Sequence, residues 1–391
     1  MMDAMIDEPL LQKLLRDLVA IDSVNPTLVP GARGEAAASG FLRDFLRGHG
    51  IDAELHEAAR GRPNVVALLG APPGASASPR PALALLAHID TVGAGDMPGA
   101  FTPVERGGRL FGRGALDIKS GVAAMCAAAI SLVRERAVFS RPLLLAAVVD
   151  EECDSIGTEA LLRKFSADAA VVLEPTGLDL VIAHKGYAWF EIITQGRAAH
   201  GSLPAEGRDA IRMMGRVLAA LDSLEETFAA RPPHPLLGHG SLHASLISGG
   251  QELSSYPAEC RLQLECRTLP GEAVTQAEAA LRKLLDGLRA GHPEFRATLR
   301  MGGARPSYEI SRDSPIVRAA ASAIAQVTGS VNLSGMAAWT DTALLAAAVI
   351  PGVVFGPSGR GLHGSEEYVE LDSVTACAEV LRRLMLLACR P

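Results

Sequence analysis

Histidine and carboxylate side chains follow the apolar runs of this sequence in a repeated way. His88 and Asp90 come directly after the run 82–87, and the pair Glu151–Glu152 follows the run 143–149. Short continuous apolar runs of this kind predict strands that are buried on both faces of a mainly parallel sheet. Because ligands of such sheets bind beyond the carboxyl ends of the strands, these side chains are expected to converge on one crevice.

Asp117, Glu174 and His363 extend this set. Glu174 follows the run 170–173, Asp117 directly precedes a predicted helix, and His363 lies in the loop after a predicted strand at 352–355. Imidazole nitrogens and carboxylate oxygens are the ligands that zinc and similar divalent metals take in proteins. The sequence therefore predicts a hydrolytic metal site at one edge of the sheet.

The spacing of His88 and Asp90 is the strongest single signal. Residues i and i+2 of a strand point to the same face, so Asp90 is expected to accept the second ring N–H of His88 and orient the ring. The other carboxylates also have ordinary explanations, because Glu151 is typical of a helix start and Asp117 of a helix N-cap. Their shared position at strand ends and helix starts favours the metal site.

Composition and charge exclude several classes of protein. The 391 residues are 48% hydrophobic and 21% charged, which predicts a globular protein of two or three domains. A net charge of −7 and 4% aromatic residues give no support for a nucleic-acid partner. The acidic N-terminus lacks a signal-peptide pattern, and the apolar runs are shorter than the about 20 residues of a membrane helix. Six cysteines without a CxxC pair are typical of reduced thiols, so a cytoplasmic location is expected.

Other catalytic motifs fail on spacing. The stretch GAGDMPG at 93–99 lacks the GxGxxG spacing of dinucleotide-binding loops. In GPSGRG at 356–361, Arg360 stands where a GxSxG nucleophile elbow needs glycine. Cys153 has no basic neighbour in sequence to activate its thiol. Neither a Rossmann oxidoreductase nor a serine or cysteine nucleophile is therefore expected.

The predicted elements change character twice along the chain. Helices are predicted at 10–20, 35–48, 121–134 and 157–165, and a further strand is predicted at 64–69. Together with the apolar runs, these elements form a βαβ-type layout. Residues 71–81 are a predicted loop. The next elements follow the order β-α-β-β-α-β of a ferredoxin-like module: 187–194, 208–224, 241–248, 259–267, 276–289 and 295–300. Helices at 314–328, 342–348 and 372–388 then resume the α/β pattern.

This order predicts one α/β domain with a second domain inserted into it. The first part of the α/β domain would cover 1–184, the inserted α+β domain 185–302, and the second part of the α/β domain 303–391. Insertion at a surface loop is well tolerated because the two chain ends there lie close together.

The chain resembles the dinuclear-zinc amidohydrolases and exopeptidases, a family that includes acetylornithine deacetylase, succinyl-diaminopimelate desuccinylase, aminoacylase and glutamate carboxypeptidase. The resemblance covers nearly the whole chain. It is carried, in family order, by SVNPTLVPGARGE (23–35), LLAHIDTV (85–92), GRGALDIKSG (112–121), VVDEECDSIGT (148–158), VLEP (172–175), GRAAHGSLP (196–204) and GLHGSEEYV (361–369). It implies a zinc exopeptidase-like fold with a ferredoxin-like lid domain that forms a homodimer.

The resemblance also implies how metals would be held. His88 and Glu174 would bind one metal, Glu152 and His363 the other, and Asp117 would bridge both. The implied cofactor is a pair of divalent ions, most simply zinc, with cobalt or manganese compatible with the same ligand types.

Further roles follow from the same resemblance. Glu151 would be the general base, and Asp90 the carboxylate that supports His88. His200 matches a lid histidine that reaches into the partner subunit's site, and Arg267 matches an arginine that binds the substrate carboxylate. A cis peptide bond is implied between Asp117 and Ile118.

The expected activity is hydrolysis of the amide bond of N-acyl amino acids by a metal-bridged hydroxide, with acetylornithine-type deacetylation as the leading case. Ser254 and the stretch WTDTALL at 339–345 depart from the desuccinylase pattern, which leaves the acyl group and the amino acid open. A desuccinylase, a small dipeptidase or a carboxypeptidase is the alternative within this chemistry. A catalytically silent dimeric binding protein is the alternative from another class, but such a protein is expected to have lost the base or a ligand. The expected partners are a small substrate and a second copy of the chain, without nucleic acid or membrane.

Overall fold

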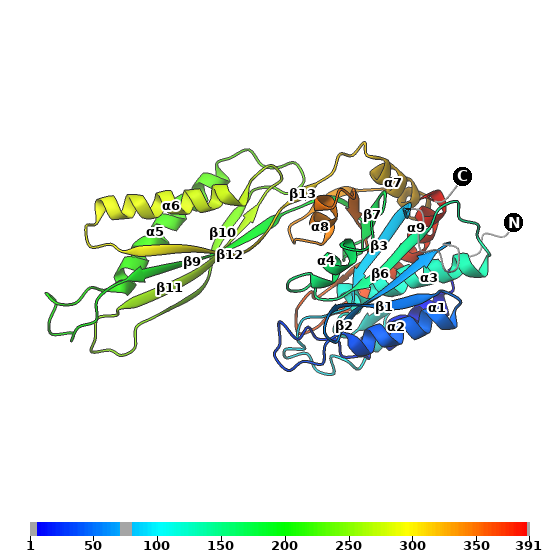
Figure 1. The fold of residues 1–391 in the computed structure, drawn as a ribbon, viewed down its shortest axis with the longest axis horizontal. Coiled ribbons are helices and arrows are strands. Elements are labelled where there is room, and N and C mark those ends of the chain that lie inside the picture. The colour runs from blue at the N-terminus through cyan, green and yellow to red at the C-terminus, as the bar shows by residue number, and fades with distance from the viewer. Residues whose placement is uncertain (1–5, 71–79, 389–391) are drawn as a thin grey trace. The chain divides into compact units, whose positions relative to one another are not determined.

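A computed structural model describes residues 6–70 and 80–388 of the chain (Figure 1). The chain divides into two compact units, the first formed by residues 1–182, 310–334 and 340–391, and the second by residues 183–309 and 335–339. Most of the predicted loop 71–81, together with Cys389, lies outside the described residues. The five cysteines among the described residues are free thiols.

The first unit contains most of a mixed sheet with the strand order β1-β2-β6-β3-β7-β15-β8-β13, in which β14 pairs with β8. The strand β13 and the last residues of β8 and β14 belong to the second unit. The centre of this sheet is parallel, because β6, β3, β7 and β15 run in one direction, whereas the outer strands are antiparallel. The strands are β1 (Ala53–Ala59), β2 (Arg62–Leu69), β3 (Leu83–His88), β6 (Leu143–Val148), β7 (Ala170–Val172), β8 (Leu180–His184), β13 (Tyr308–Glu309), β14 (Leu333–Met336) and β15 (Gly352–Val354). This arrangement confirms the predicted α/β class.

Helices flank this sheet in two packed groups. In one group α3 contacts α1 and α9, and α9 also contacts α7; in the other, α4 contacts α8. The helices of this unit are α1 (Glu8–Val19), α2 (Ala36–Gly48), α3 (Ser120–Arg134), α4 (Ile156–Leu162), α7 (Pro315–Thr328), α8 (Thr342–Ala347) and α9 (Leu371–Ala388). Helix ends are set locally, as at α1, where the Asp7 side chain accepts the Leu10 N–H at 3.1 Å.

The central strands are buried along their whole length. Every residue of β3 and β6 is buried, as expected for strands covered by helices on both faces. The helix α3 is equally enclosed. The segment Ala115–Arg134 is long and apolar enough to cross a membrane, but 89% of its most apolar 18-residue window is buried inside the protein, so α3 is a core helix of this unit.

The structure has a small antiparallel sheet that the sequence did not indicate. Its strand order is β16-β17-β5-β4, formed by Gly359–Arg360, Tyr368–Glu370, Arg109–Phe111 and Val104–Arg106. The strand β17 contacts α9 and the turn Ala115–Lys119 before α3. The pairing of Val369 with Leu110 joins the segment that carries His363 to the segment that leads to Asp117. Two loops that are about 250 residues apart in sequence are thereby held side by side.

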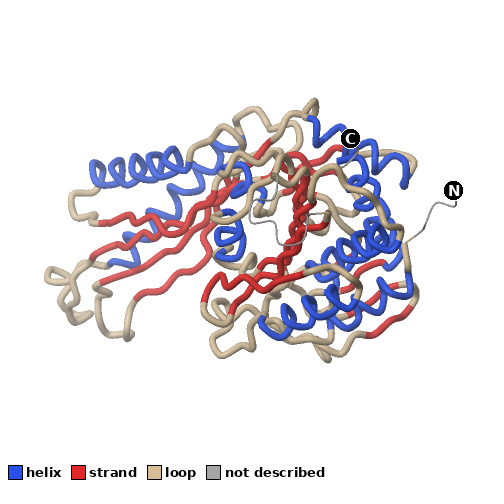
Figure 2. Tube along the Cα trace, turned by 45° about the vertical axis from the view of Figure 1, so that its right-hand side comes forward, coloured by secondary structure: helices blue, strands red, loops and turns tan. Residues whose placement is uncertain are grey.

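The second unit has the predicted β-α-β-β-α-β order. Its strands are β9 (Gly186–Gln195), β10 (Ser241–Gly249), β11 (Glu259–Thr268) and β12 (Ala297–Arg305), and its helices are α5 (Ala210–Ala229) and α6 (Val274–Gly291). The sheet order is β10-β11-β9-β12, and both helices pack on the sheet (Figure 2). Apolar residues of β9, β11, α5 and α6 form a separate core, including Phe190, Leu262, Met214 and Leu281.

Candidate metal centre

The carboxyl ends of the parallel strands bring the predicted ligands together. His88 is the last residue of β3, and Glu151 and Glu152 follow β6, which pairs with β3 in parallel through His88 and Val148. Glu174 lies two residues beyond the end of β7, the other parallel neighbour of β3. The strand ends therefore bring these side chains together at one edge of the sheet, as predicted.

His88 lies at the middle of the cluster. Its Nε2 atom is 3.1 Å from Asp117 Oδ1, 3.9 Å from Glu174 Oε2 and 4.0 Å from Glu151 Oε2. The ligand atoms of His88, Glu151 and Glu174 all lie within 4.8 Å of one another, as do those of His88, Asp117 and Glu152. Two overlapping groups of this kind can hold metal ions.

His363 completes the second side of the cluster. Its Nε2 atom is 3.2 Å from Glu152 Oε2 and 3.4 Å from Asp117 Oδ2. The backbone of His363 is left-handed, with φ of 58°, a conformation that is uncommon outside glycine and concentrated at functional sites. The other members of the cluster are largely buried, whereas 53% of the His363 side chain is exposed.

The structure modifies the expected role of Asp90. The closest partner of His88 Nδ1 is the main-chain carbonyl oxygen of Asp90, at 3.0 Å, and the carboxylate Oδ1 is 3.5 Å away. The carboxylate instead accepts the main-chain N–H groups of Glu151 and Glu152, at 3.2 and 3.3 Å. Asp90 thus holds both His88 and the start of the acidic loop, because the main chain turns there and leaves its carboxylate facing that loop.

A buried polar network behind Asp90 was not predicted. Asn25 donates to Asp90 Oδ2 at 2.8 Å and to Asp150 Oδ1 at 3.0 Å, and Arg62 lies 2.8 Å from the same Asp150 oxygen. Arg62 also pairs with Glu35. Asn25 and Glu35 belong to the motif SVNPTLVPGARGE, which was the only signal that could have found them. The network fixes the loop that carries Glu151, in which Asp150 has a left-handed φ of 69°.

The cluster has more buried negative charge than the two histidines can balance. Burial raises the pKa of Glu151 and Glu174 well above the usual value, and the charge of Glu174 adds to the effect on Glu151. Burial also raises the pKa of Glu152. Hydrogen bonds to Asp117 and Glu152 raise the pKa of His363 to about 10. Oε1 of Glu152 and Oε1 of Glu174 are buried without a hydrogen-bond partner. Both carboxylates approach a histidine through Oε2 and leave Oε1 without a partner, and such a buried set of carboxylates and imidazoles fits divalent cations.

Asp341 is a further buried carboxylate near this cluster that sequence reasoning did not identify. It accepts the Thr158 hydroxyl at 2.5 Å, while its Oδ1 atom is buried without a partner. Burial raises its pKa to about 6, and its charge contributes to the raised pKa of Glu151 and Glu174. It lies in the stretch WTDTALL, which departs from the desuccinylase pattern.

His200 and Arg267 belong to the second unit, whereas the residues of the cluster belong to the first. His200 is exposed on the loop after β9, where its Nδ1 atom is 2.8 Å from the Ser202 hydroxyl. Arg267 is the next-to-last residue of β11; it pairs with Glu265, and its guanidinium group lies 5.7 Å from the centre of the Tyr187 ring. In the second unit by itself, neither side chain contacts a metal ligand.

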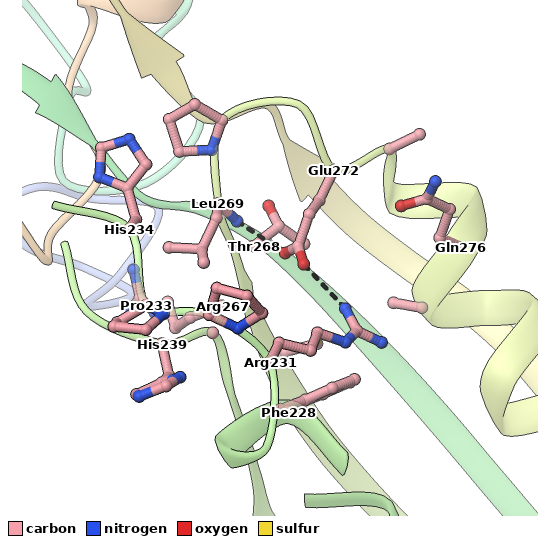
Figure 3. Close-up of a pocket in the computed structure, with 16 residues that line it drawn as sticks. Phe228, Arg231, Pro233, His234, His239, Arg267, Thr268, Leu269, Glu272 and Gln276 are labelled. Carbon is pink, nitrogen blue, oxygen red and sulfur yellow. Dashed lines mark hydrogen bonds and ion pairs between the residues drawn. The ribbon is translucent and has the colours of Figure 1, made fainter.

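Arg267 borders a cavity of about 250 Å³ in the second unit (Figure 3). Arg231 and Glu272 form an ion pair of 2.8 Å across this cavity, and Glu272 also accepts the Leu269 N–H at 2.9 Å. His234 and His239 line the same cavity. All of its lining residues belong to the second unit.

The chain is similar to known proteins in both sequence and fold. The acetylornithine deacetylase of Myxococcus xanthus is 31% identical, over 97% of this chain and 98% of that protein. Among solved structures, a tripeptidase from Staphylococcus aureus has a TM-score of 0.81 at 20% identity, covering 99% of this chain and 100% of that chain. A dinuclear metal-binding peptidase of the M20 family from Bacillus subtilis has a TM-score of 0.73 at 18% identity, with 98% of each chain covered.

The family assignment follows from the extent of these matches. Residues 84–387 match the peptidase family M20/M25/M40, and this range includes every member of the metal-ligand cluster. The acetylornithine deacetylase relative matches over almost its whole length. The chain therefore belongs to peptidase family M20/M25/M40 and is a metal-dependent amidohydrolase.

Proposed function

We propose that this protein hydrolyses the amide bond of N-acyl amino acids, with N-acetylornithine as the leading substrate. The main support is the cluster in which His88 and His363 face the two oxygens of Asp117. The carboxylates of this cluster also include Glu151, Glu152 and Glu174. The substrate assignment is supported by the full-length acetylornithine deacetylase relative.

We assign two divalent metal ions to this cluster, most simply zinc, with cobalt or manganese as alternatives. His88 and Glu174 would hold one ion, Glu152 and His363 the other, and Asp117 would serve both. The two buried carboxylate oxygens without partners, on Glu152 and Glu174, support this assignment. When bound, the two cations polarise the amide carbonyl and lower the pKa of water.

Glu151 would transfer a proton from the attacking water to the leaving amine. Water adds to the amide carbon, the carbon–nitrogen bond breaks, and the amine nitrogen must receive a proton. Because burial raises the pKa of Glu151, its carboxylate can take a proton from the attacking water and keep it until the amine leaves. The N–H that Glu151 donates to Asp90 fixes the loop from which it acts.

The second unit would supply the remaining groups as a lid and dimerisation domain. Arg267 would bind the substrate carboxylate, and His200 would act in the site of the partner subunit. The outer edge of β10 is not paired within the described chain, and Leu246, Ile247 and Leu253 on and after this strand are exposed. An apolar edge strand of this kind is a surface on which a second copy can pair. The free thiols support a cytoplasmic location.

A substrate panel tests this proposal. N-acetyl, N-succinyl and N-formyl amino acids and short dipeptides would be assayed with the zinc-, cobalt- and manganese-loaded protein. The highest kcat/KM is expected for an N-acetyl amino acid, with N-acetylornithine first. A preference for the succinyl compounds would identify a desuccinylase, and a preference for dipeptides a peptidase. No hydrolysis with any metal would support a silent binding protein and overturn the proposal.

A further inference from the structure

Glu367 is a buried carboxylate that lies four residues after His363. Only 1% of its surface is exposed. Its Oε1 atom accepts the main-chain N–H groups of Leu116 and Asp117, at 2.9 and 3.1 Å. Its Oε2 atom accepts the N–H of Gly114 at 3.1 Å and a guanidinium N–H of Arg113 at 2.7 Å. Both oxygens of one carboxylate are therefore used by a single loop, residues 113–117.

This loop has backbone donors that no helix can satisfy. Asp117 has φ −112° and ψ 91°, which is outside the helical region, so the turn before α3 does not continue the hydrogen-bond pattern of that helix. A buried main-chain N–H without an acceptor costs roughly 1–3 kcal/mol. The Glu367 carboxylate removes this cost at the N–H groups of Leu116 and Asp117.

The geometry of the loop leaves little room for another arrangement. Gly114 has a left-handed φ of 78°, and a Cβ atom there would lie 2.7 Å from Thr91 Cγ2. Arg113, which is 2% exposed, donates to the carbonyl oxygens of Gly93 and Gly364, at 3.1 and 2.8 Å. Gly364 directly follows His363. The Arg113–Glu367 pair therefore ties the loop of Asp117 to the loop of His363.

We infer that Glu367 is a positioning residue that couples the two proposed metal sites, because it holds the Asp117 ligand that both sites share. It holds the main chain of Asp117 from the same segment that carries His363. The position of Asp117 Oδ2 relative to His363 Nε2, at 3.4 Å, and of Asp117 Oδ1 relative to His88 Nε2, at 3.1 Å, depends on this contact. The inference rests on the proposed role of Asp117 as the ligand shared by both metals.

The variant Glu367→Gln tests this role. The carboxamide keeps the size of the side chain but replaces one acceptor oxygen with an NH2 group, which would face either Gly114 and Arg113 or Leu116 and Asp117, all of them donors. Zinc would be titrated into the metal-free protein in competition with a chelator. We expect zinc affinity to fall roughly 10- to 100-fold, the usual effect of losing a partner that orients a metal ligand. Catalytic activity should return at excess zinc.

Glu366→Gln is the matched control. Glu366 is the neighbouring residue, its side chain is 65% exposed, and it pairs only with the exposed Arg106 among the interactions described, at 3.1 Å. This variant should bind two zinc ions with wild-type affinity. A folded Glu367→Gln protein that also binds two zinc ions with wild-type affinity, whatever its Tm, would show that Glu367 is purely structural and would overturn the inference.

A second variant covers the case in which Glu367→Gln does not fold. Arg113→Lys keeps the positive charge beside Glu367, but one ammonium group cannot reproduce the fork that reaches Glu367 and Gly364 together. Weaker zinc binding in this variant supports the inference, and unchanged binding contradicts it. Wild-type protein that binds two zinc ions but hydrolyses no compound of the panel would refute the proposed function alone, because these tests read metal affinity.

Discussion

His88 and His363 face opposite oxygens of one carboxylate. The Nε2 atom of His88 lies 3.1 Å from Asp117 Oδ1, and the Nε2 atom of His363 lies 3.4 Å from Asp117 Oδ2. The two histidines come from segments that are far apart in sequence, so this arrangement exists only in the folded chain. Because Asp117 faces both histidines, its loss should disturb both of the proposed metal sites.

The first prediction therefore concerns Asp117 and metal content. Asp117→Asn keeps the size of the side chain but removes its charge, so it should weaken the binding of both metals, whereas His363→Asn should weaken only one. Elemental analysis after dialysis against limiting zinc measures this difference. Chelation of the wild-type protein should abolish amide hydrolysis, and zinc or cobalt should restore it. Full activity in protein shown to be free of metal would refute metal dependence.

The second prediction separates two adjacent glutamates. Glu151→Gln should keep two metals but lose at least about 10²-fold in kcat, because a general base contributes on that scale. Glu152→Gln should instead lose one metal, since Glu152 Oε2 lies 3.2 Å from His363 Nε2. Zinc content and kcat at saturating zinc distinguish the two. If Glu151→Gln lost a metal and recovered full turnover in excess zinc, the two roles would have to be exchanged.

The third prediction concerns pH and stability. Burial and the nearby charge of Glu174 raise the pKa of Glu151 above 4.5; hydrogen bonds outweigh burial and raise the pKa of His88 above 6.5. The folded metal-free protein then keeps protons that the unfolded chain loses, so its stability falls as pH rises above these values. Metals bind the deprotonated ligands, so the increase in Tm given by zinc should be larger at about pH 7.5 than at about pH 5.5.

Thermal unfolding of chelated and zinc-loaded protein at the two pH values measures this effect. The double variant Glu151→Gln/Glu174→Gln should show a smaller change of metal-free Tm with pH, because it lacks two of the groups whose pKa is raised. A zinc-dependent increase in Tm that is the same at both pH values would contradict the proton competition.

The fourth prediction concerns Arg267. A substrate carboxylate needs a charged donor, and loss of such a hydrogen bond costs about 1.5–3 kcal/mol, or roughly 10- to 100-fold. Arg267→Ala should lower kcat/KM by that factor for substrates with a free α-carboxylate and much less for their amides. Arg261→Ala is the control, because Arg261 lies on the same strand and pairs with Glu191 at 2.8 Å. Equal losses on acids and amides would indicate that the Arg267–Glu265 pair is structural.

The fifth prediction tests the assembly. If His200 serves the partner subunit, His200→Asn and Glu151→Gln proteins are each nearly inactive, yet refolding an equal mixture should make about half of the dimers mixed. One site of each mixed dimer has both residues intact, so activity should recover to about a quarter of the wild-type value. No recovery, with mixed dimers confirmed by mass, would remove His200 from the catalytic residues.

Much of the fold and the cluster could be predicted from local patterns. Apolar runs become buried strands because only such runs can fill the centre of a parallel sheet, and their ends identified His88, Glu151, Glu152 and Glu174. The β-α-β-β-α-β order of the second unit also followed from periodicity. The pattern did not indicate β1 or the small sheet of β4, β5, β16 and β17, because the strands of that sheet are two or three residues long.

The sequence by itself determined which residue types stand at the strand ends, and hence that a metal-dependent hydrolase was to be expected. Only the tertiary structure decided that Asp90 holds His88 mainly through its carbonyl oxygen, and that Asn25 and Glu367 hold the ligand loops. The physical reason is that strand periodicity is a local property of the chain. A hydrogen bond such as that between Glu367 and the Leu116 N–H joins residues 251 positions apart, and exists only after the loops have packed together.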